Sequence, residues 1–510
     1  MRGGFSEITR KLIHVSMGLF ALLLAYLTWW QALLFAGVAL FHNMFVLPRY
    51  MRGRIFRGAA GEKGHDIGIL LYPVSIAILI LIFRNHLQIV AAAWGMLAFG
   101  DGFASIVGTL VGGPRLPWNR EKSWSGTLAF CVFGFLGARF LWVFTEVGRF
   151  IGGLASIPSC AASLSAAADL IRQGVHVPDP AWLLTPAGFA GLARAAALDG
   201  WDTGIVFSIA LVSILVAAVE SMPIGVNDNI SVPLVASGLF CCFALADPDS
   251  WTANAPLVLS LLPWAIGINV AIAAAAWAAR SVSLSGVVGG ILVGAAIFAF
   301  GGWRAFAVLA MFFVLGTVAT KAGYARKAAL GIAQEKGGRR GAKNAIANCG
   351  MGAILAVVAA TSPFGSLAML GLVAAFATAA ADTVSSEIGQ AWGRRTYLVT
   401  TFRPVPPGTE GAVSLEGTLA GIGASAVLAL AAFALGLVTP AGAALVVVAA
   451  FFGSTLESYM GATWERAKLI DNEAINFANT LAGALFAIAL AVSLRALPFL
   501  PSAADTRTLF

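Results

Sequence analysis

The sequence predicts an all-α membrane protein that crosses the bilayer many times. Of its 510 residues, 59% are hydrophobic and only 11% are charged, whereas soluble domains carry about 25% charged residues. The hydrophobic residues come in blocks of about 17–25, which as helices are long enough to cross the hydrocarbon core. Because backbone polar groups inside a bilayer must be satisfied within their own segment, we expect these blocks to be helices.

Fifteen segments have this composition, and the stretch 146–203 is less clear, because it fits either a further helical hairpin or a surface segment. The sequence therefore predicts 15–17 membrane helices. In chain order, the fifteen expected helices cover residues 12–28, 31–47, 67–83, 87–100, 124–144, 204–220, 230–246, 255–279, 283–301, 305–320, 345–360, 366–382, 417–436, 440–457 and 476–494.

Basic residues are unevenly distributed among the expected loops. Residues 49–63 hold five Lys or Arg residues and residues 321–343 hold seven, whereas the loop after residue 246 carries Asp247 and Asp249. The positive-inside rule then predicts that the N-terminus and all the basic loops are cytoplasmic, in a multi-pass protein of the cell (inner) membrane. The N-terminus lacks the cleavage site of a removable signal, so we expect the first helix to stay.

Three elements occur twice in the same order, which indicates an internal duplication. "GDGFASIVG" (100–108) and "ADTVSSEIG" (381–389) each place Ser four residues and Gly seven residues after an Asp. "SWSGTLA" (123–129) matches "SLEGTLA" (414–420), and both halves continue with Glu-Ser followed by Asp-Asn. We therefore expect two distantly related parallel repeats, residues 1–279 and 280–510, joined near Arg280 without a long linker.

The repeated residues favour phosphate chemistry. Carboxylates are the usual oxygen ligands of Mg²⁺, which also binds substrate phosphates, and Gly and Ser at a helix start present N–H groups to an anion. The repeated acids and Lys122 are expected at the cytoplasmic ends of helices, where a soluble charged substrate meets a lipid. Neither G-x-x-x-x-G-K-[ST] nor H-E-x-x-H is present, so the sequence indicates no P-loop and no zincin site.

The first half resembles the dolichol kinase and phytol kinase family. The motifs that carry the resemblance are "RKLIHVSMG" (10–18), "GDGFASIVG" (100–108), "EKSWSGTLA" (121–129) and "VNDNISVPL" (226–234). They span most of residues 5–245, and 146–203 looks like an insertion. The resemblance implies phosphorylation of a long-chain isoprenoid alcohol with CTP as the donor.

The second half resembles a membrane family that includes transmembrane protein 19 and the plant phytyl-phosphate kinase. The matching motifs are "SLSGVVGGILVG" (283–294), "ADTVSSEIG" (381–389), "PGTEGAVSLEGTLA" (407–420) and "GSTLESYMGA" (453–462). Glu410 stands where Asn is expected and Glu457 where Asp is expected. The resemblance implies that this half converts the monophosphate to the diphosphate, so that one chain carries two kinases in sequence.

Site roles follow from these motif positions. In the first half, Asp101 and Asp228 are expected to bind Mg²⁺ or to polarise the alcohol. The residues expected to bind nucleotide phosphates or to complete the first site are Lys122, Ser123, Gly126, Glu220, Asn229, Lys11 and His14. In the second half, the expected acidic residues are Asp382, Glu387, Glu457 and Asp471, with Asp382 and Glu387 as metal ligands. The expected phosphate-binding residues there are Arg340, Asn348, Thr409, Gly411 and Ser414.

Two other functions fit part of the pattern. A cytidylyltransferase that makes a CDP-activated lipid needs the same Mg²⁺–CTP site but releases pyrophosphate. A lipid or metabolite transporter with parallel repeats fits the helix count and the duplication, although acids at one membrane edge argue against it. No nucleic-acid partner is expected, and the sequence leaves open the prenyl chain length, the nucleotide and the oligomeric state.

Overall fold

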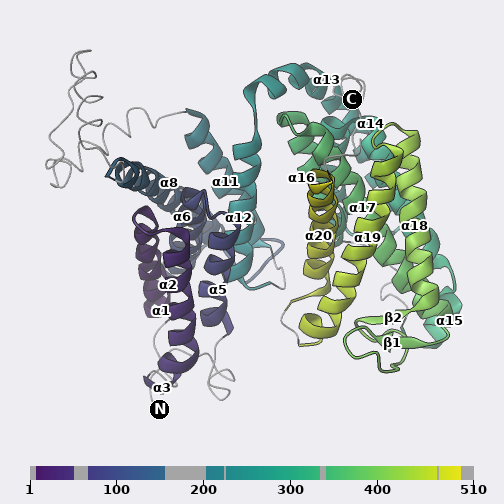
Figure 1. Cartoon of the computed structure of the whole chain (residues 1–510), viewed down its shortest axis with the longest axis horizontal. Coiled ribbons are helices and arrows are strands. Elements are labelled where there is room, and N and C mark those ends of the chain that lie inside the picture. Colours follow the sequence, from purple (N-terminus) through teal and green to yellow (C-terminus); the bar gives the residue numbers. More distant parts are fainter. Residues whose placement is uncertain are drawn as a thin grey trace. The chain divides into compact units, whose positions relative to one another are not determined.

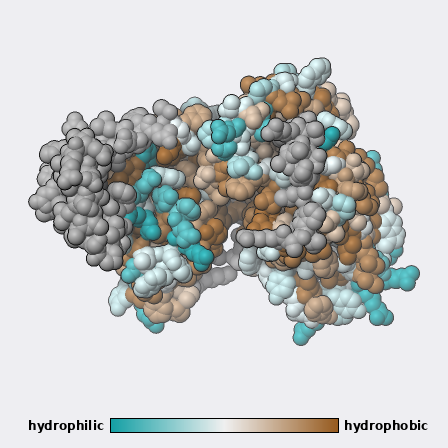
Figure 2. Space-filling model, turned by 45° about the horizontal axis from the view of Figure 1, so that its top comes forward, coloured by the Kyte–Doolittle hydropathy of each residue, from teal (hydrophilic) through white to brown (hydrophobic). Residues whose placement is uncertain are grey.

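The computed structural model describes residues 7–50, 67–155, 203–222, 226–332, 341–467 and 470–494. The chain is almost entirely helical and divides into two compact units, Met1–Ala244 and Leu245–Phe510 (Figure 1). Thirteen helices in the described residues are long and apolar enough to cross a membrane, and hydrophobic side chains cover much of the visible surface (Figure 2). The protein is therefore an all-α, multi-pass integral membrane protein, as the sequence predicts.

The first unit is built around the buried helix α6 (Leu87–Gly95), on which α8 (Trp124–Ala155) packs closely. A Cβ added to Gly95 would lie 2.8 Å from the backbone of Gly137, so glycine lets these two helices approach, as small residues do in membrane proteins. The other elements of this unit are α1 (Glu7–Met17), the 3₁₀-helix η1 (Gly18–Ala25), α2 (Trp29–Phe41), the π-helix η2 (His42–Val46), α3 (Leu47–Tyr50), α5 (Ile67–Ile82), the π-helix η3 (Met96–Asp101), α7 (Gly102–Leu110), α11 (Thr203–Ser221) and α12 (Asp228–Leu245).

The second unit is built around α17 (Gly365–Trp392). In the most apolar stretch of this helix, 89% is buried. Its neighbours are α14 (Leu284–Lys321), α16 (Ala342–Thr361), α18 (Leu415–Ala434), α19 (Pro440–Met460) and α20 (Asn472–Ser493). The remaining elements are α13 (Pro248–Ala278), α15 (Tyr324–Ala329), the π-helix η6 (Gly461–Glu465) and two short strands, β1 (Thr396–Leu398) and β2 (Ala412–Ser414). The strands form an antiparallel hairpin that the sequence analysis did not anticipate.

Three of the predicted segments account for the difference between fifteen segments and thirteen spans. Residues 283–301 and 305–320 form the single element α14, which is kinked at Gly302, where φ is 73°. The segment at 67–83 forms α5, whose 16 residues extend about 24 Å, which is less than the roughly 30 Å of the hydrocarbon core. Most of 146–203 lies outside the described residues; α8 itself continues to Ala155.

The two repeated aspartates do not lie at helix ends, and this part of the prediction was wrong. Asp101 lies within the span Leu87–Leu110, and Asp382 lies within α17, which continues to Trp392. The residues after each Asp remain mostly apolar or small, and one carboxylate does not end a helix that is packed on its neighbours. Both acids therefore lie within candidate membrane spans, and ionisable groups in such segments are costly and usually functional.

The boundary between the two compact units falls after Ala244, earlier in the chain than the repeat boundary predicted after residue 279. The physical reason is the packing of α13, which runs along α14 and belongs to the second unit.

Candidate functional site

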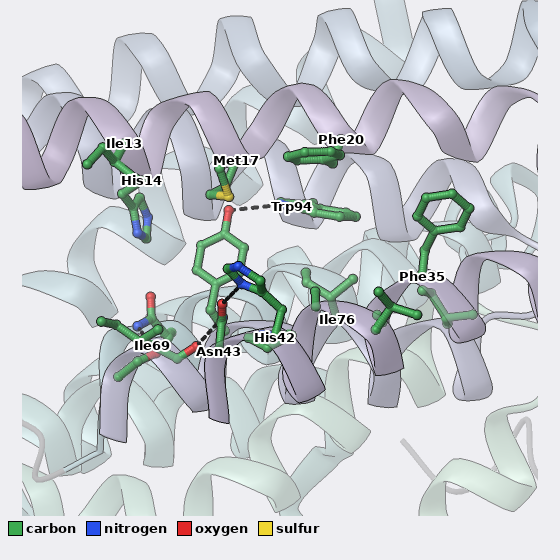
Figure 3. Close-up of a pocket in the computed structure, with 18 of the residues that line it drawn as sticks. Ile13, His14, Met17, Phe20, Phe35, His42, Asn43, Ile69, Ile76 and Trp94 are labelled. Atoms are coloured by element: carbon green, nitrogen blue, oxygen red, sulfur yellow. Dashed lines mark hydrogen bonds between the residues drawn. The ribbon is translucent and has the colours of Figure 1, made fainter. Parts of the chain in front are cut away.

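A large cavity of about 1050 Å³ lies within the first unit. α1 and η1 line one side of it, α2 and α5 line another, and α6 contributes Trp94 (Figure 3). Its two ends differ in chemistry. The apolar side chains of Phe20, Phe35 and Ile76 lie toward one end (Figure 3), whereas His14 lies toward the other end, with Asp101 Oδ2 at 3.3 Å from its Nε2.

Polar side chains at the second end are held by hydrogen bonds. Asn229 Nδ2 donates to the carbonyl of Gly68 at 2.8 Å, which ties the start of α12 to α5. Trp94 Nε1 donates to the Tyr72 hydroxyl at 2.8 Å, and Tyr72 meets the His14 ring edge-on with centroids 4.9 Å apart. These contacts fix the wall between the apolar part of the cavity and its polar end.

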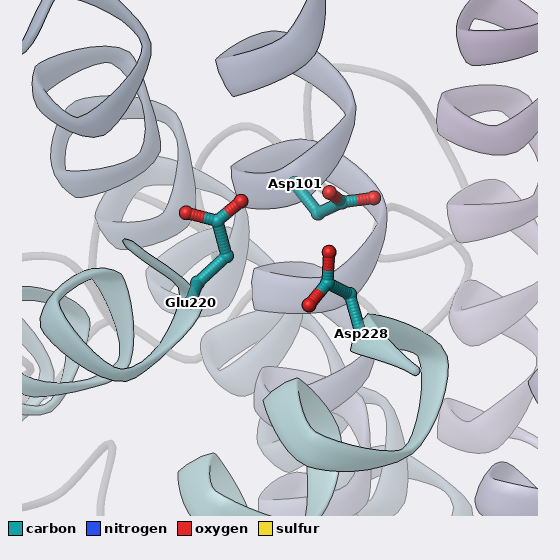
Figure 4. A group of neighbouring side chains, drawn as sticks. All are labelled: Asp101, Glu220 and Asp228. Carbon is teal, nitrogen blue, oxygen red and sulfur yellow. The ribbon is translucent and has the colours of Figure 1, made fainter. Parts of the chain in front are cut away.

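Three carboxyl groups from distant parts of the sequence converge at this polar end. Asp101 lies where η3 continues directly into α7, Glu220 lies in the last turn of α11, and Asp228 begins α12. Figure 4 shows their carboxyl groups turned toward one another, and one oxygen of each lies within 4.8 Å of the others. The sequence analysis selected all three, and the structure brings them together. A short π-helical segment such as η3 is a local irregularity that often occurs at functional sites.

Two lysines neutralise part of this negative charge. Lys11 Nζ donates to Asp101 Oδ2 at 2.7 Å, and His14 Nε2 lies 3.3 Å from the same oxygen. Lys122 Nζ donates to Glu220 Oε1 at 2.6 Å and lies 3.5 Å from Asp228 Oδ2. Burial opposes the charged form of Lys122, but the carboxylates, Glu220 first, outweigh that effect and raise the pKa of Lys122. The lysine is therefore an ammonium ion at neutral pH.

The three carboxylates fit a divalent cation. Mg²⁺ takes oxygens at about 2.0–2.1 Å in an octahedron, so neighbouring ligands lie about 3 Å apart and opposite ones about 4 Å apart. The observed upper limit of 4.8 Å is close to that range. Three carboxylates against two lysines also leave negative charge for a cation to neutralise.

Ser123 and Gly126 form the start of α8. Ser123 Oγ accepts from the N–H of Gly126 at 3.2 Å, which is a helix N-cap. A Cβ on Gly126 would lie 2.9 Å from the carbonyl of Ala104, so this glycine lets α8 pack against α7. Both residues therefore have a structural role beside the site, and their contact with nucleotide phosphates stays a prediction.

The second unit repeats this local packing residue for residue. Ser414 Oγ accepts from the N–H of Gly417 at 3.1 Å, and a Cβ on Gly417 would lie 2.5 Å from the carbonyl of Ser385. Ala104 and Ser385 both stand three residues after the Asp of their own motif. The chain then returns to the cap serine in the same way, through the antiparallel pairs Arg115↔Ser123 and Thr396↔Ser414. The repeated Ser-x-x-Gly segment thus has the same local structure in both units.

The acids of the second unit gather around Asp382. Asp382 of α17 and Glu457 of α19 share a hydrogen bond, and Glu465 at the end of η6 interacts electrostatically with both. Glu465 also interacts with Glu410 and with Asp471. Glu465 was not among the predicted site residues, although it lies between Glu457 and Asp471, because the first repeat has no counterpart of it.

Asp471 has a clear structural role as well. Its side chain accepts a hydrogen bond from the N–H of Ala474 at 3.0 Å and so caps α20. Lys343 Nζ lies 3.9 Å from Asp471 Oδ2. Gly411 has φ of 73° and lies against Ser458 and Ala462, so that the hairpin loop touches the end of α19.

Glu387 forms a buried ion pair with Lys327, whose Nζ also donates to the carbonyl of Thr320 at 2.9 Å. Glu387 stands five residues after Asp382 and so on a different face of α17. The role of Glu387 as a metal ligand therefore stays a prediction. The ammonium group of Lys327, which already pairs with this carboxylate, makes metal binding there less favourable. Sequence reasoning missed Lys327 because sixty residues separate the two partners.

The other predicted phosphate-binding residues make local contacts. Asn348 is buried and donates to the carbonyl of Asn344 within α16, and the Thr409 hydroxyl donates to the carbonyl of Pro406. Arg340 lies outside the described residues. None of these contacts tests a role in binding phosphate.

Fold, cavity and acids together define a polytopic membrane protein with a carboxylate-rich site at one end of an apolar cavity. Residues 267–484 match the family model described as integral membrane protein DUF92. An uncharacterized membrane protein of Synechocystis sp. is 40% identical over 204 residues, which are 39% of this chain and 78% of that protein. The chain belongs to this integral membrane family.

Two plant relatives carry more informative names. Protein VTE6 of Arabidopsis thaliana, chloroplastic, is 41% identical over 213 residues, which are 40% of this chain and 64% of that protein. A Glycine max protein named "Probable phytol kinase 3, chloroplastic" is 28% identical over 243 residues, 45% of this chain and 61% of that protein. The chain thus spans less than two thirds of the length of each of these two plant relatives. No solved structure matches it.

These matches support the predicted relationship to phytol kinases. They do not test the fusion of two kinase halves, which stays a prediction.

Proposed function

We propose that the chain is a membrane phosphotransferase that converts a long-chain isoprenoid alcohol to its monophosphate in the first unit. The observation that carries this proposal is the cavity, which has an apolar end for a hydrocarbon chain and an end where Asp101 and Asp228 lie for a hydroxyl group. Relatives named phytol kinase support the same class of reaction.

The transfer itself needs few groups. The alcohol oxygen attacks the γ-phosphorus of a nucleoside triphosphate. The bond from that phosphorus to the oxygen that bridges the β- and γ-phosphates breaks, and the nucleoside diphosphate leaves. Asp228 is suited to take the alcohol proton, because its side chain is 43% exposed and lines the cavity, whereas that of Asp101 is 4% exposed. Lys122 and Lys11 would neutralise charge on the transferred group, which is the main requirement of phosphoryl transfer.

Mg²⁺ would be held by Asp101, Glu220 and one oxygen of Asp228, which leaves the other oxygen of Asp228 for the alcohol proton, and when bound it would neutralise the phosphate oxygens and orient them. Lys122 would then turn from Glu220 toward the phosphates. CTP is the proposed donor, with the N-terminus and both sites on the cytoplasmic side, where nucleotides are available.

The second unit would phosphorylate the monophosphate to the diphosphate. Its support is the repeated packing around Asp382, with Glu457 and Glu465 as further acids. In this step an oxygen of the prenyl phosphate attacks the γ-phosphorus, and the nucleoside diphosphate leaves as before. Glu465 interacts electrostatically with Asp382 and with Glu457. Acidic groups of this kind favour a site that binds phosphate through a metal ion rather than through direct contacts.

The test uses purified full-length protein, Mg²⁺, each nucleoside triphosphate in turn, and phytol or geranylgeraniol. We expect prenyl phosphate and nucleoside diphosphate in equal amounts, and a loss of at least about a hundredfold with Asp228→Asn. Release of pyrophosphate with a CDP-lipid would instead establish a cytidylyltransferase. Absence of nucleotide turnover, with movement of a lipid or metabolite across vesicles, would establish a transporter.

A further inference from the structure

The cavity of the first unit is not closed on all sides. α1 packs mainly on α7, and α2 packs mainly on α5. The cavity lies between these pairs, and side chains that line it are also strongly exposed: Phe20 is 50% exposed, Phe35 is 53% exposed and Val38 is 59% exposed. Phe20 belongs to η1, and the other two belong to α2, so the open side lies between η1 and α2.

The outward surfaces of the two elements that flank this opening are apolar. Leu19 on η1 and Leu34 and Phe41 on α2 are each more than half exposed. Both elements belong to candidate membrane spans, Ile8–Ala25 and Trp29–Tyr50, and the second of these is only 11% buried. An apolar surface of this kind within a membrane span faces lipid chains.

Polarity changes along the cavity in the direction that a single-chain lipid alcohol requires. His14 lies toward one end of the cavity, and the residues at the opening, Phe20 and Phe35, lie toward the other (Figure 3). The Asp101 carboxylate contacts His14 and Lys11, and it lies within 4.8 Å of the carboxyl group of Asp228. A hydroxyl group at the carboxylates therefore directs its hydrocarbon chain toward the opening between η1 and α2.

We propose that the substrate enters the first unit sideways from the bilayer, between η1 and α2, and that its hydrocarbon chain extends back through this opening while the hydroxyl group reacts. This inference rests on the proposed function and adds a consequence to it. Because the end of the chain stays in lipid, the cavity sets no upper limit on chain length.

The experiment measures phosphorylation in phosphatidylcholine nanodiscs, with geraniol as a short alcohol and geranylgeraniol and a dolichol as long ones. Val38→Trp narrows the opening, because this residue lines the cavity. Leu34→Trp is the matched control, because Leu34 lies on the same helix and is 61% exposed but does not line the cavity. Neither residue belongs to the acidic site.

The wild-type protein should phosphorylate all three alcohols. Val38→Trp should raise KM for the two long alcohols by about tenfold and change kcat/KM for geraniol by less than about twofold, and Leu34→Trp should behave as the wild type. Equal losses for short and long alcohols with Val38→Trp, or a wild-type protein that rejects dolichol while it accepts geranylgeraniol, would overturn the proposal. No turnover of any alcohol by the wild type would overturn the proposed function and this inference with it.

Discussion

Lys122 connects two helices of the first unit through their acids. Its ammonium group binds Glu220 at the end of α11 and lies near Asp228 at the start of α12. Glu220 is 5% exposed, so it depends on this lysine for a counter-charge. One side chain therefore serves both the geometry of the site and its charge balance.

Replacement of Lys122 separates these two roles. Lys122→Met leaves a buried carboxylate unpaired, which costs about 3–5 kcal/mol of stability, and it removes a proposed phosphate contact. The double variant Lys122→Met/Glu220→Gln should recover most of the thermal stability in detergent but none of the kinase activity. Recovery of activity together with stability would show that Lys122 has a structural role only.

The Lys327–Glu387 pair of the second unit makes a contrasting prediction. Lys327 is 1% exposed and Glu387 is 6% exposed, and the pair connects α15 to α17. Glu387→Gln should lower the melting temperature strongly, because it leaves a buried ammonium ion, whereas Lys327→Met/Glu387→Met should be closer to the wild type. Melting curves with and without Mg²⁺ check this. A melting temperature that Mg²⁺ raises in the wild type and not in Glu387→Gln would support the metal-ligand role instead.

At the scale of elements, each repeat depends on one close helix contact. Glycine at 126 or 417 lets the capped helix approach the backbone of the helix that carries the Asp. The packing of helices on small residues, rather than a hydrophobic effect, is what stabilises such contacts in a membrane.

Alanine at these glycines should therefore impair one reaction each. Gly126→Ala and Gly417→Ala bring a Cβ to 2.9 Å and 2.5 Å from a carbonyl oxygen, which costs about 1–3 kcal/mol and displaces the acid. We expect Gly126→Ala to reduce phosphorylation of the alcohol only, and Gly417→Ala to reduce phosphorylation of the monophosphate only. Gly290→Ala is the control, since nothing lies within 4 Å of its added Cβ. Loss of both reactions from either variant would contradict two independent sites.

Hydrophobic periodicity and motif order were enough to predict most elements, because each depends on neighbouring residues. The apolar blocks became helices, and Ser123 and Ser414 became N-caps. Contacts between residues that are distant in the sequence were harder to predict. The pairing of Lys327 with Glu387 could not be predicted, because packing of the whole unit brings the two residues together. For the same reason, the ends of the helices that contain Asp101 and Asp382 could not be predicted.

At the scale of the molecule, the chain holds two compact units with the same motif order. The convergence of Asp101, Glu220 and Asp228 was predicted from motif recurrence, whereas the cavity beside them was not, since its walls come from four separate segments. In the second unit the matched residues come together only in part: Asp382 and Glu457 meet, while Glu387 pairs elsewhere. Sequential action of the units is accordingly the central claim.

Product analysis with two single variants tests that claim most directly. Purified wild-type protein, Asp101→Asn and Asp382→Asn would each receive Mg²⁺, labelled CTP and geranylgeraniol, and the prenyl mono- and diphosphates would be separated. The account predicts diphosphate from the wild type, no lipid product from Asp101→Asn, and monophosphate alone from Asp382→Asn. Diphosphate formation by Asp382→Asn at the wild-type rate would contradict it.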